Sequence, residues 1–207
     1  ICSRNQAKAA VPADRAGEFE AFIREFDAAL KNEYAGCDGG VTLTCEKTAL
    51  DGALTPEATA NMLRTLLAVP QGVQAMNVDF PGLVQTSLNM GVMEMKEDGL
   101  YFGISVRSCI ATQKDMMVQR LKAILELGGG SFTLRGSYPG WQYDRNSALR
   151  EEVLGAYKSV CGKQGTIEAT HGGLECGLFV EKLPGLDAVS FGPELHDVHS
   201  VKERLNV

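Results

Sequence analysis

The chain has 207 residues, 44% of them hydrophobic and 22% charged, with a formal net charge of -6, which is typical of globular proteins with one or two domains. The acidic balance, without a basic patch interleaved with aromatic residues, argues against a nucleic-acid partner, and no apolar run approaches the ~20 residues of a membrane helix. The sequence shows no secretory signal, and its six cysteines form no Cys-x-x-Cys pair, so we expect a cytoplasmic protein with reduced thiols.

Three segments in the first half carry apolar residues at helical spacing. The first covers 16–32, where phenylalanine, isoleucine and leucine side chains alternate with charged ones. The second begins at Thr55-Pro56, a capping threonine followed by proline at the first helical position, and ends before Pro70. The third covers 113–127 and ends at three consecutive glycines. We therefore predict three helices.

Strand-like patterns lie between these helices. Apolar and polar residues alternate over 41–46 and again over 131–135, which predicts two short strands. Residues 85–95 and 100–107 flank a turn containing Asp98-Gly99, which predicts a hairpin. The order helix, strand, helix, hairpin, helix, strand indicates an α+β domain, with an antiparallel sheet covered by helices on one face and its first strand missing.

The pattern changes after residues 137–141, Ser-Tyr-Pro-Gly-Trp, where we expect a domain boundary. Ser147 can cap a helix that runs through Cys161, and the segments 167–170 and 188–191 resemble strands. Strand, helix and strand in this order are typical of a parallel α/β sheet. About seventy residues are too few to complete such a sheet. Because the chain also opens without methionine, we expect a segment of a longer protein.

A glycine-rich turn follows the first of these strand-like segments. It reads His171-Gly172-Gly173, with Glu175 two positions further on. The glycines would let a ligand approach the backbone, and helix amides beyond them could receive an anion such as a carboxylate. A tight turn that needs positive φ explains the same residues equally well. The pattern alone leaves both interpretations open.

Four further side chains are candidates for chemistry. His196 and His199 have the spacing of a two-histidine metal site, but zinc needs three or four ligands and no second pair is present. Cys176 could act as a nucleophile, although most lone cysteines are inert packing residues. Arg107 ends an apolar strand and could hold a substrate carboxylate in bidentate fashion, or form an ordinary salt bridge.

Four strings in fixed order carry a family resemblance. The chain resembles the aminoacyl-histidine dipeptidases, the bacterial carnosine-cleaving branch of the M20 metallopeptidases, from about Pro12 to its end. The most specific string is the third, HGGLECGLF. The strings are TSLNMGV (86–92), YPGWQ (138–142), HGGLECGLF (171–179), and SFGP (190–193) followed by His199-Ser200.

The resemblance implies a two-domain enzyme, in which an α+β lid is inserted into an α/β catalytic domain that holds a pair of zinc ions. On this interpretation residues 1–134 are a lid or dimerisation-type domain that lacks its first strand. Residues 135–207 are the C-terminal part of the catalytic domain, truncated. This implication agrees with the change of pattern after residue 137.

The resemblance also assigns site residues. His199 matches the last metal ligand, although the family often has prolines on either side of the His-Ser pair, where this sequence has valines. The other ligands and the general-base glutamate are placed before Ile1, so the resemblance implies no catalytic residue here. The turn of His171, Gly172, Gly173 and Glu175 would face the substrate. Arg107 would lie near the substrate carboxylate. His196 has no counterpart.

The mechanism implied is hydrolysis of Xaa-His dipeptides such as carnosine by a water that two zinc ions activate, and the chain alone would be inactive. The substrate would be a short peptide, and a homodimer is one expected assembly. An alternative from another class is a non-catalytic lid-type module for dimerisation or binding, with the strand at 100–107 and the helix at 113–127 as a shared surface. A cysteine hydrolase that uses Cys176 is a third hypothesis.

Overall fold

A computed structural model gives the fold of the chain and describes residues 4–170 and 173–206. The chain divides between Leu63 and Arg64 into two compact units, and each is described by itself. The boundary predicted near residue 134 lies within the second unit and stays a prediction. No helix in the described parts of the chain is long and apolar enough to cross a membrane.

The first unit is built on the helix α1 (Ala16–Tyr34), which a single 3-10 turn precedes. The Asp27 carboxylate of this helix accepts hydrogen bonds from the Leu43 amide (2.7 Å) and from the Lys31 ammonium group (2.7 Å). These contacts fold residues 41–43 back onto α1. The strand predicted at 41–46 is wrong, because no neighbouring strand pairs with these residues in the described chain.

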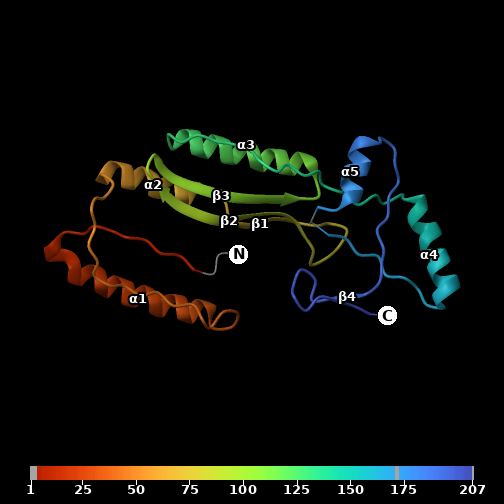
Figure 1. Ribbon diagram of the computed structural model, residues 1–207, viewed down its shortest axis with the longest axis horizontal. Helices are drawn as coiled ribbons and strands as arrows, with labels where there is room; N and C mark the ends of the chain where they lie inside the picture. Colours follow the sequence, from red (N-terminus) through yellow and green to blue (C-terminus); the bar gives the residue numbers. More distant parts are fainter. Residues whose placement is uncertain (1–3, 171–172, 207) are drawn as a thin grey trace. The chain divides into compact units, whose positions relative to one another are not determined.

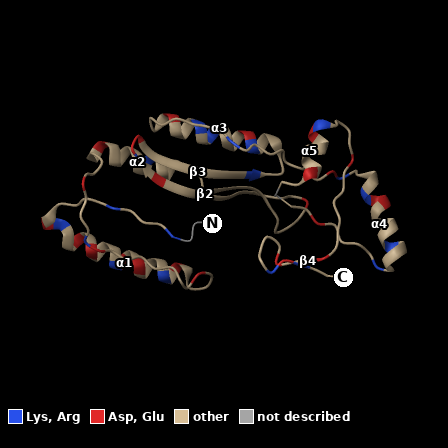
Figure 2. Ribbon diagram, viewed as in Figure 1, with Lys and Arg blue, Asp and Glu red and all other residues tan. Residues whose placement is uncertain are grey.

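The second helix, α2 (Pro56–Ala68), begins in the first unit as the sequence predicts. The Thr55 hydroxyl oxygen accepts a hydrogen bond from the Ala58 amide at 3.2 Å, which is the capping contact expected of threonine before proline. Both acidic and basic residues lie along α1 (Figure 2).

The second unit contains a three-stranded antiparallel sheet in the order β1-β2-β3. Strands β2 (Val84–Lys96) and β3 (Gly99–Ser108) form the predicted hairpin, and Gly99 adopts a φ of 143°, which favours glycine. Strand β1 (Gly72–Met76) was not predicted. It is short and irregular, with register shifts on either side of Ala75, so it carries little alternation.

Helix α3 (Ala111–Leu127) covers one face of this sheet (Figure 1). Met117 and Leu121 of α3 pack on Leu88 of β2 and on Val69, and all four side chains are buried. Partly buried residues surround this core: Met90, Ile104, Val106, Ile124 and Phe132. The predicted α+β arrangement, an antiparallel sheet with helices on one face, is therefore confirmed.

The remaining chain contains the two helices α4 (Ala148–Cys161) and α5 (Glu175–Lys182). Ser147 caps α4 as predicted, because its hydroxyl oxygen accepts from the Arg150 amide at 3.0 Å. A short two-stranded hairpin, β4 (Leu195–His196) with β5 (Arg204–Leu205), follows α5.

The strands predicted at 131–135, 167–170 and 188–191 are wrong. A strand is defined by the hydrogen bonds of a ladder, and the described residues supply no partner strand for these three segments. The alternation in the sequence identifies side chains that favour a pleated surface, but it does not identify a neighbour.

Candidate functional site

The carboxyl end of β3 presents Arg107. Opposite residues of an antiparallel pair share a face, and Leu88 and Val106 are an opposite pair that packs in the core under α3. Arg107 is opposite Ser87, one position along each strand, and so belongs to the other face of the sheet. Its side chain is exposed. A guanidinium group in this place is free to bind a carboxylate from solvent.

A buried polar network fixes the strand end that carries Arg107. The Thr86 hydroxyl group lies 2.9 Å from the Ser108 hydroxyl oxygen and donates to the Gln113 side-chain oxygen at 2.5 Å. The Gln85 amide group donates to the same Gln113 oxygen at 3.0 Å. Each of these polar groups has a partner, which burial requires. The sequence did not predict this network, because no single-residue signal distinguishes a buried glutamine from an exposed one.

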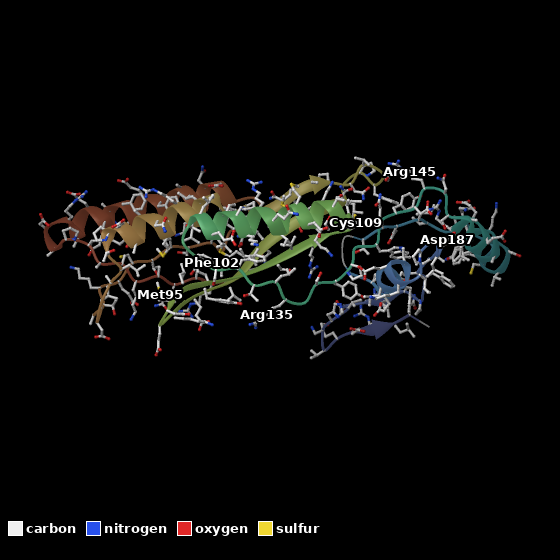
Figure 3. All side chains as sticks on the ribbon, turned by 90° about the horizontal axis from the view of Figure 1, so that it is seen from above. Met95, Phe102, Cys109, Arg135, Arg145 and Asp187 are labelled. Carbon is white, nitrogen blue, oxygen red and sulfur yellow. The ribbon has the colours of Figure 1, made fainter. Side chains whose placement is uncertain are left out.

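The segment around Gly140 crosses this strand end at close range. A Cβ atom on Gly140 would lie 2.6 Å from the Cys109 carbonyl oxygen and 2.8 Å from that of Ser108, so only glycine fits. The Lys114 ammonium group donates to the carbonyl oxygen of Tyr138 at 2.5 Å. Burial raises the pKa of the Cys109 thiol, which packs here as an apolar group. Cys109 is labelled at the end of β3 in Figure 3.

Helix α5 packs through Gly177 on the crossing segment, residues 138–141. This glycine is buried, and a Cβ atom there would lie 3.2 Å from the Pro139 carbonyl oxygen and 3.4 Å from that of Gly140. Glu175 lies in the first turn of α5 and is exposed. A carboxylate in the first turn is favoured by the partial positive charge of a helix amino terminus.

The glycine-rich turn before α5 contacts Tyr138. A Cβ atom on Gly173 would lie 2.4 Å from Cδ1 of the Tyr138 ring. Partial burial raises the pKa of the Tyr138 hydroxyl group, and the charges of Glu175 and Cys176 raise it further. The structure thus brings Gly173 and Glu175 together with Tyr138, whereas His171 and Gly172 lie outside the described residues. From the sequence, Tyr138 was identified only as part of the string YPGWQ (138–142).

The two remaining histidines lie on the β4–β5 hairpin. His199 is exposed and has a left-handed backbone with φ 64°, and its amide donates to the Glu203 carboxylate at 2.7 Å. His196 Nε2 lies 3.5 Å from the Glu194 carboxylate. An ion pair between Asp197 and Arg204 closes the hairpin. No contact found among the described residues joins His199 to Arg107 or to Glu175.

The described residues do not by themselves fit a metal centre. Within 4–170 and 173–206, no group of three or more histidine, cysteine, aspartate or glutamate side chains could hold a metal ion. Zinc in proteins takes three or four such ligands. His199 therefore has no partner ligands in this part of the chain, and we derive no chemical step that passes through a metal.

Cys176 lies on the inner side of α5. Its Sγ atom lies 3.9 Å from the Val189 carbonyl oxygen, and the side chain is half-buried. This is the environment of a packing thiol. A cavity of about 440 Å³ is lined by residues of α4, by the segments 166–170 and 186–191, and by Trp141.

An antiparallel sheet covered by α3 on one face, followed by α4 and α5, is the architecture of part of a dipeptidase. The chain is 31% identical to a solved structure, the aminoacylhistidine dipeptidase from Vibrio alginolyticus, with a TM-score of 0.84 over 94% of this chain and 40% of that one. It is also 34% identical over 202 residues to the cytosol non-specific dipeptidase of Escherichia coli (strain K12), which covers 97% of this chain and 42% of that protein.

The resemblance deduced from the sequence is therefore confirmed: the chain is homologous to a segment of these dipeptidases. It spans about 40% of the length of either one. No protein-family model matches the chain.

Proposed function

We propose that the whole protein to which this chain belongs is a dipeptidase that hydrolyses Xaa-His dipeptides such as carnosine. The observation that carries this proposal is identity of 31–34% to two dipeptidases across nearly the whole chain, with a TM-score of 0.84 for one of them. Similarity confined to the sheet would have supported a shared fold only. Here the similarity extends over 97% of the chain and is not confined to the sheet.

The residues of this chain take separate roles in the proposal. Arg107, exposed at the end of β3, would bind the free carboxylate of the dipeptide. The turn of His171, Gly172, Gly173 and Glu175 would line the substrate site. Binding the terminal carboxylate would restrict the enzyme to short peptides, because a longer peptide places its carboxylate elsewhere.

The proposal also extends to the metal ion. We propose zinc, with His199 as the ligand that this chain contributes; this rests on the match of the His199-Ser200 pair to the family's last ligand. The described residues supply no complete ligand set. In the proposal, the other ligands and the general base come from the rest of the whole protein. Residues 1–134 would be the lid and 135–207 part of the catalytic domain.

A cytoplasmic location and a homodimer are also proposed. Exposed apolar side chains on the β2–β3 hairpin, including Val92, Met95 and Tyr101, support a surface between two copies. Light scattering after size-exclusion chromatography of the whole protein would give twice the mass of one chain. A monomer at micromolar concentration would overturn this part.

The experiment that tests the function is hydrolysis of β-alanyl-histidine by the whole protein. We expect cleavage that a chelator abolishes and zinc restores, whereas the 207-residue chain alone should be silent. Full activity after alkylation by iodoacetamide would exclude a cysteine nucleophile. If the metal-replete whole protein cleaves no dipeptide, the proposed activity is wrong, and the alternative of a binding module takes its place.

A further inference from the structure

Gly173, just before α5, lies closer to the Tyr138 ring than a residue with a side chain could. A Cβ atom on Gly173 would lie 2.4 Å from Cδ1, 2.7 Å from Cε1 and 3.2 Å from Cγ of Tyr138. The tyrosine ring therefore packs against the backbone of the turn and occupies the place where any other residue would carry its side chain. Such an approach indicates that the ring and the turn fix one another.

The backbone that carries this ring is held from two other sides. The carbonyl oxygen of Tyr138 accepts from the Lys114 ammonium group of α3 at 2.5 Å. Two residues later, Gly140 lies so close to the Ser108 and Cys109 carbonyl groups that a Cβ atom would overlap them. The segment cannot shift to relieve pressure on the ring. A larger residue at 173 must therefore rotate the ring or displace the turn.

The helix that follows the turn is held to the same segment. Gly177 in α5 packs on the Pro139 carbonyl oxygen, where a Cβ atom would lie 3.2 Å away. The chain is thus held at Gly177 within α5 and contacts the Tyr138 ring at Gly173. Glu175 lies between them, so its place depends on both.

We propose that Tyr138 is a positioning residue for the substrate site: its ring, packed on Gly173, sets where Gly173 and Glu175 lie relative to the strand end that carries Arg107. This inference rests on the proposed function and adds a residue to that site. It also gives a steric reason for glycine at position 173, where a Cβ atom would overlap the Tyr138 ring.

The electrostatics of the contact agree with this role. Partial burial, and then the charge of Glu175, raise the pKa of the Tyr138 hydroxyl group. A tyrosine with an ordinary pKa of about 10 is already neutral near pH 7, and the raised pKa extends this neutral range to higher pH. A neutral ring packs on a glycine backbone without the cost of burying a charge.

The test is a double-mutant cycle in the whole protein, with β-alanyl-histidine as substrate. Gly173→Ala should lower kcat/KM by about tenfold or more, chiefly by raising KM, because the new methyl group displaces the turn. In a Tyr138→Ala background the same Gly173→Ala change should cost less than about twofold, since the clash is absent. Gly155→Ala in α4, where a Cβ atom meets nothing within 4 Å, is the matched control and should retain wild-type kinetics.

Two further variants separate positioning from folding. A merely structural defect lowers the amount of folded enzyme, and so lowers apparent kcat with KM unchanged. Tyr138→Phe keeps the ring and should keep KM within about twofold of wild type, whereas Tyr138→Ala should raise it. Because Tyr138→Ala adds no atoms, it also tests the inference if Gly173→Ala does not fold.

The outcomes distinguish this inference from the function on which it rests. If the wild-type protein cleaves no dipeptide, the proposed function is wrong and the inference is lost with it. If the wild type is active but Gly173→Ala costs the same with and without Tyr138, or Tyr138→Ala leaves KM unchanged, the positioning role alone is overturned.

Discussion

The position of Arg107 depends on neighbouring residues that are polar but uncharged. The strand end that carries it is fixed by the buried hydrogen bonds among Thr86, Ser108 and Gln113. Its own guanidinium group is exposed. These hydrogen bonds hold the backbone of the strand end in place, while the guanidinium group stays in solvent. A charge presented in this way is suited to binding a carboxylate.

Replacing Arg107 should affect binding more than turnover. For Arg107→Ala in the whole protein we expect KM for β-alanyl-histidine to rise by about tenfold to a hundredfold, the worth of a charged hydrogen bond of ~1.5–3 kcal/mol. Steady-state kinetics measure this. Arg120→Ala, at an exposed position of α3, is the control and should change KM less than about twofold. Equal KM values for the two variants would contradict the role.

The charged group of Asp187 has defined hydrogen-bond partners. Its carboxylate accepts from the Ser147 hydroxyl group at 2.7 Å and from the Leu149 amide at 2.9 Å. These hydrogen bonds, the one from Ser147 above all, hold the pKa of Asp187 below its ordinary value. Figure 3 places Asp187 beside the start of α4, so the carboxylate ties the chain after α5 to that helix.

Acid should therefore weaken the fold through Asp187. A pKa lowered in the folded state gives stability that is present above the unfolded pKa of about 3.9 and is lost as the pH falls through the folded value. We expect urea unfolding of the whole protein between pH 6 and pH 3 to depend less steeply on pH in Asp187→Asn than in wild type. Asp115→Asn, an exposed aspartate of α3, should follow the wild-type curve. Parallel curves for all three would contradict this.

At the scale of elements, the sheet, α3 and α5 are joined by the crossing segment of residues 138–141. Glycines allow two of its contacts: Gly140 on the end of β3, and Gly177 of α5 on the segment. Lys114 of α3 adds a hydrogen bond to the Tyr138 carbonyl oxygen. Backbone lies against backbone at these points, so small residues decide how closely the elements approach.

Adding one methyl group at Gly140 should separate these elements. The Cβ atom would meet backbone atoms at 2.6–2.8 Å, and backbone cannot rotate away as a side chain can. We expect Gly140→Ala to lower the free energy of unfolding by about 1–3 kcal/mol. Gly155→Ala, in the open middle of α4, should instead raise it by about 0.5–1 kcal/mol. Denaturant titration of the whole protein checks both, and a Gly140→Ala variant as stable as wild type would contradict the close approach.

At the scale of the whole molecule, the described chain has a small core. Its buried apolar side chains are Val69, Leu88, Cys109, Met117 and Leu121, and four of them cluster between α3 and the sheet. Many large apolar side chains of the described chain are exposed, among them Leu67, Leu127 and Val160. Stability must therefore depend strongly on the few buried contacts under α3.

Truncation in this core should be costly. Met117 is 2% exposed, and Met117→Ala should lower the free energy of unfolding by about 2–5 kcal/mol through lost burial and the cavity left behind. Met116, the next residue of α3, is 53% exposed, and Met116→Ala should change it by less than about 0.5 kcal/mol. Comparable losses in both variants would show that α3 does not pack on the sheet as described.

The sequence by itself determined the parts that local interactions govern. Thr55 before proline and Ser147 each cap a helix where expected, and Asp98-Gly99 turns the hairpin. These signals involve residues within four positions of one another, so they are visible in one line of text. The ordered strings of the family resemblance likewise needed no coordinates.

Only the tertiary structure decided which extended segments become strands and which side chains meet at the site. The alternating segments at 41–46 and 131–135 have no partner strand in the described chain, whereas the weakly patterned β1 pairs with β2. The contact of Tyr138 with Gly173 joins residues far apart in the sequence. Such pairings depend on which backbones lie side by side after folding, and a strand ladder or a packed ring has no signature within either segment alone.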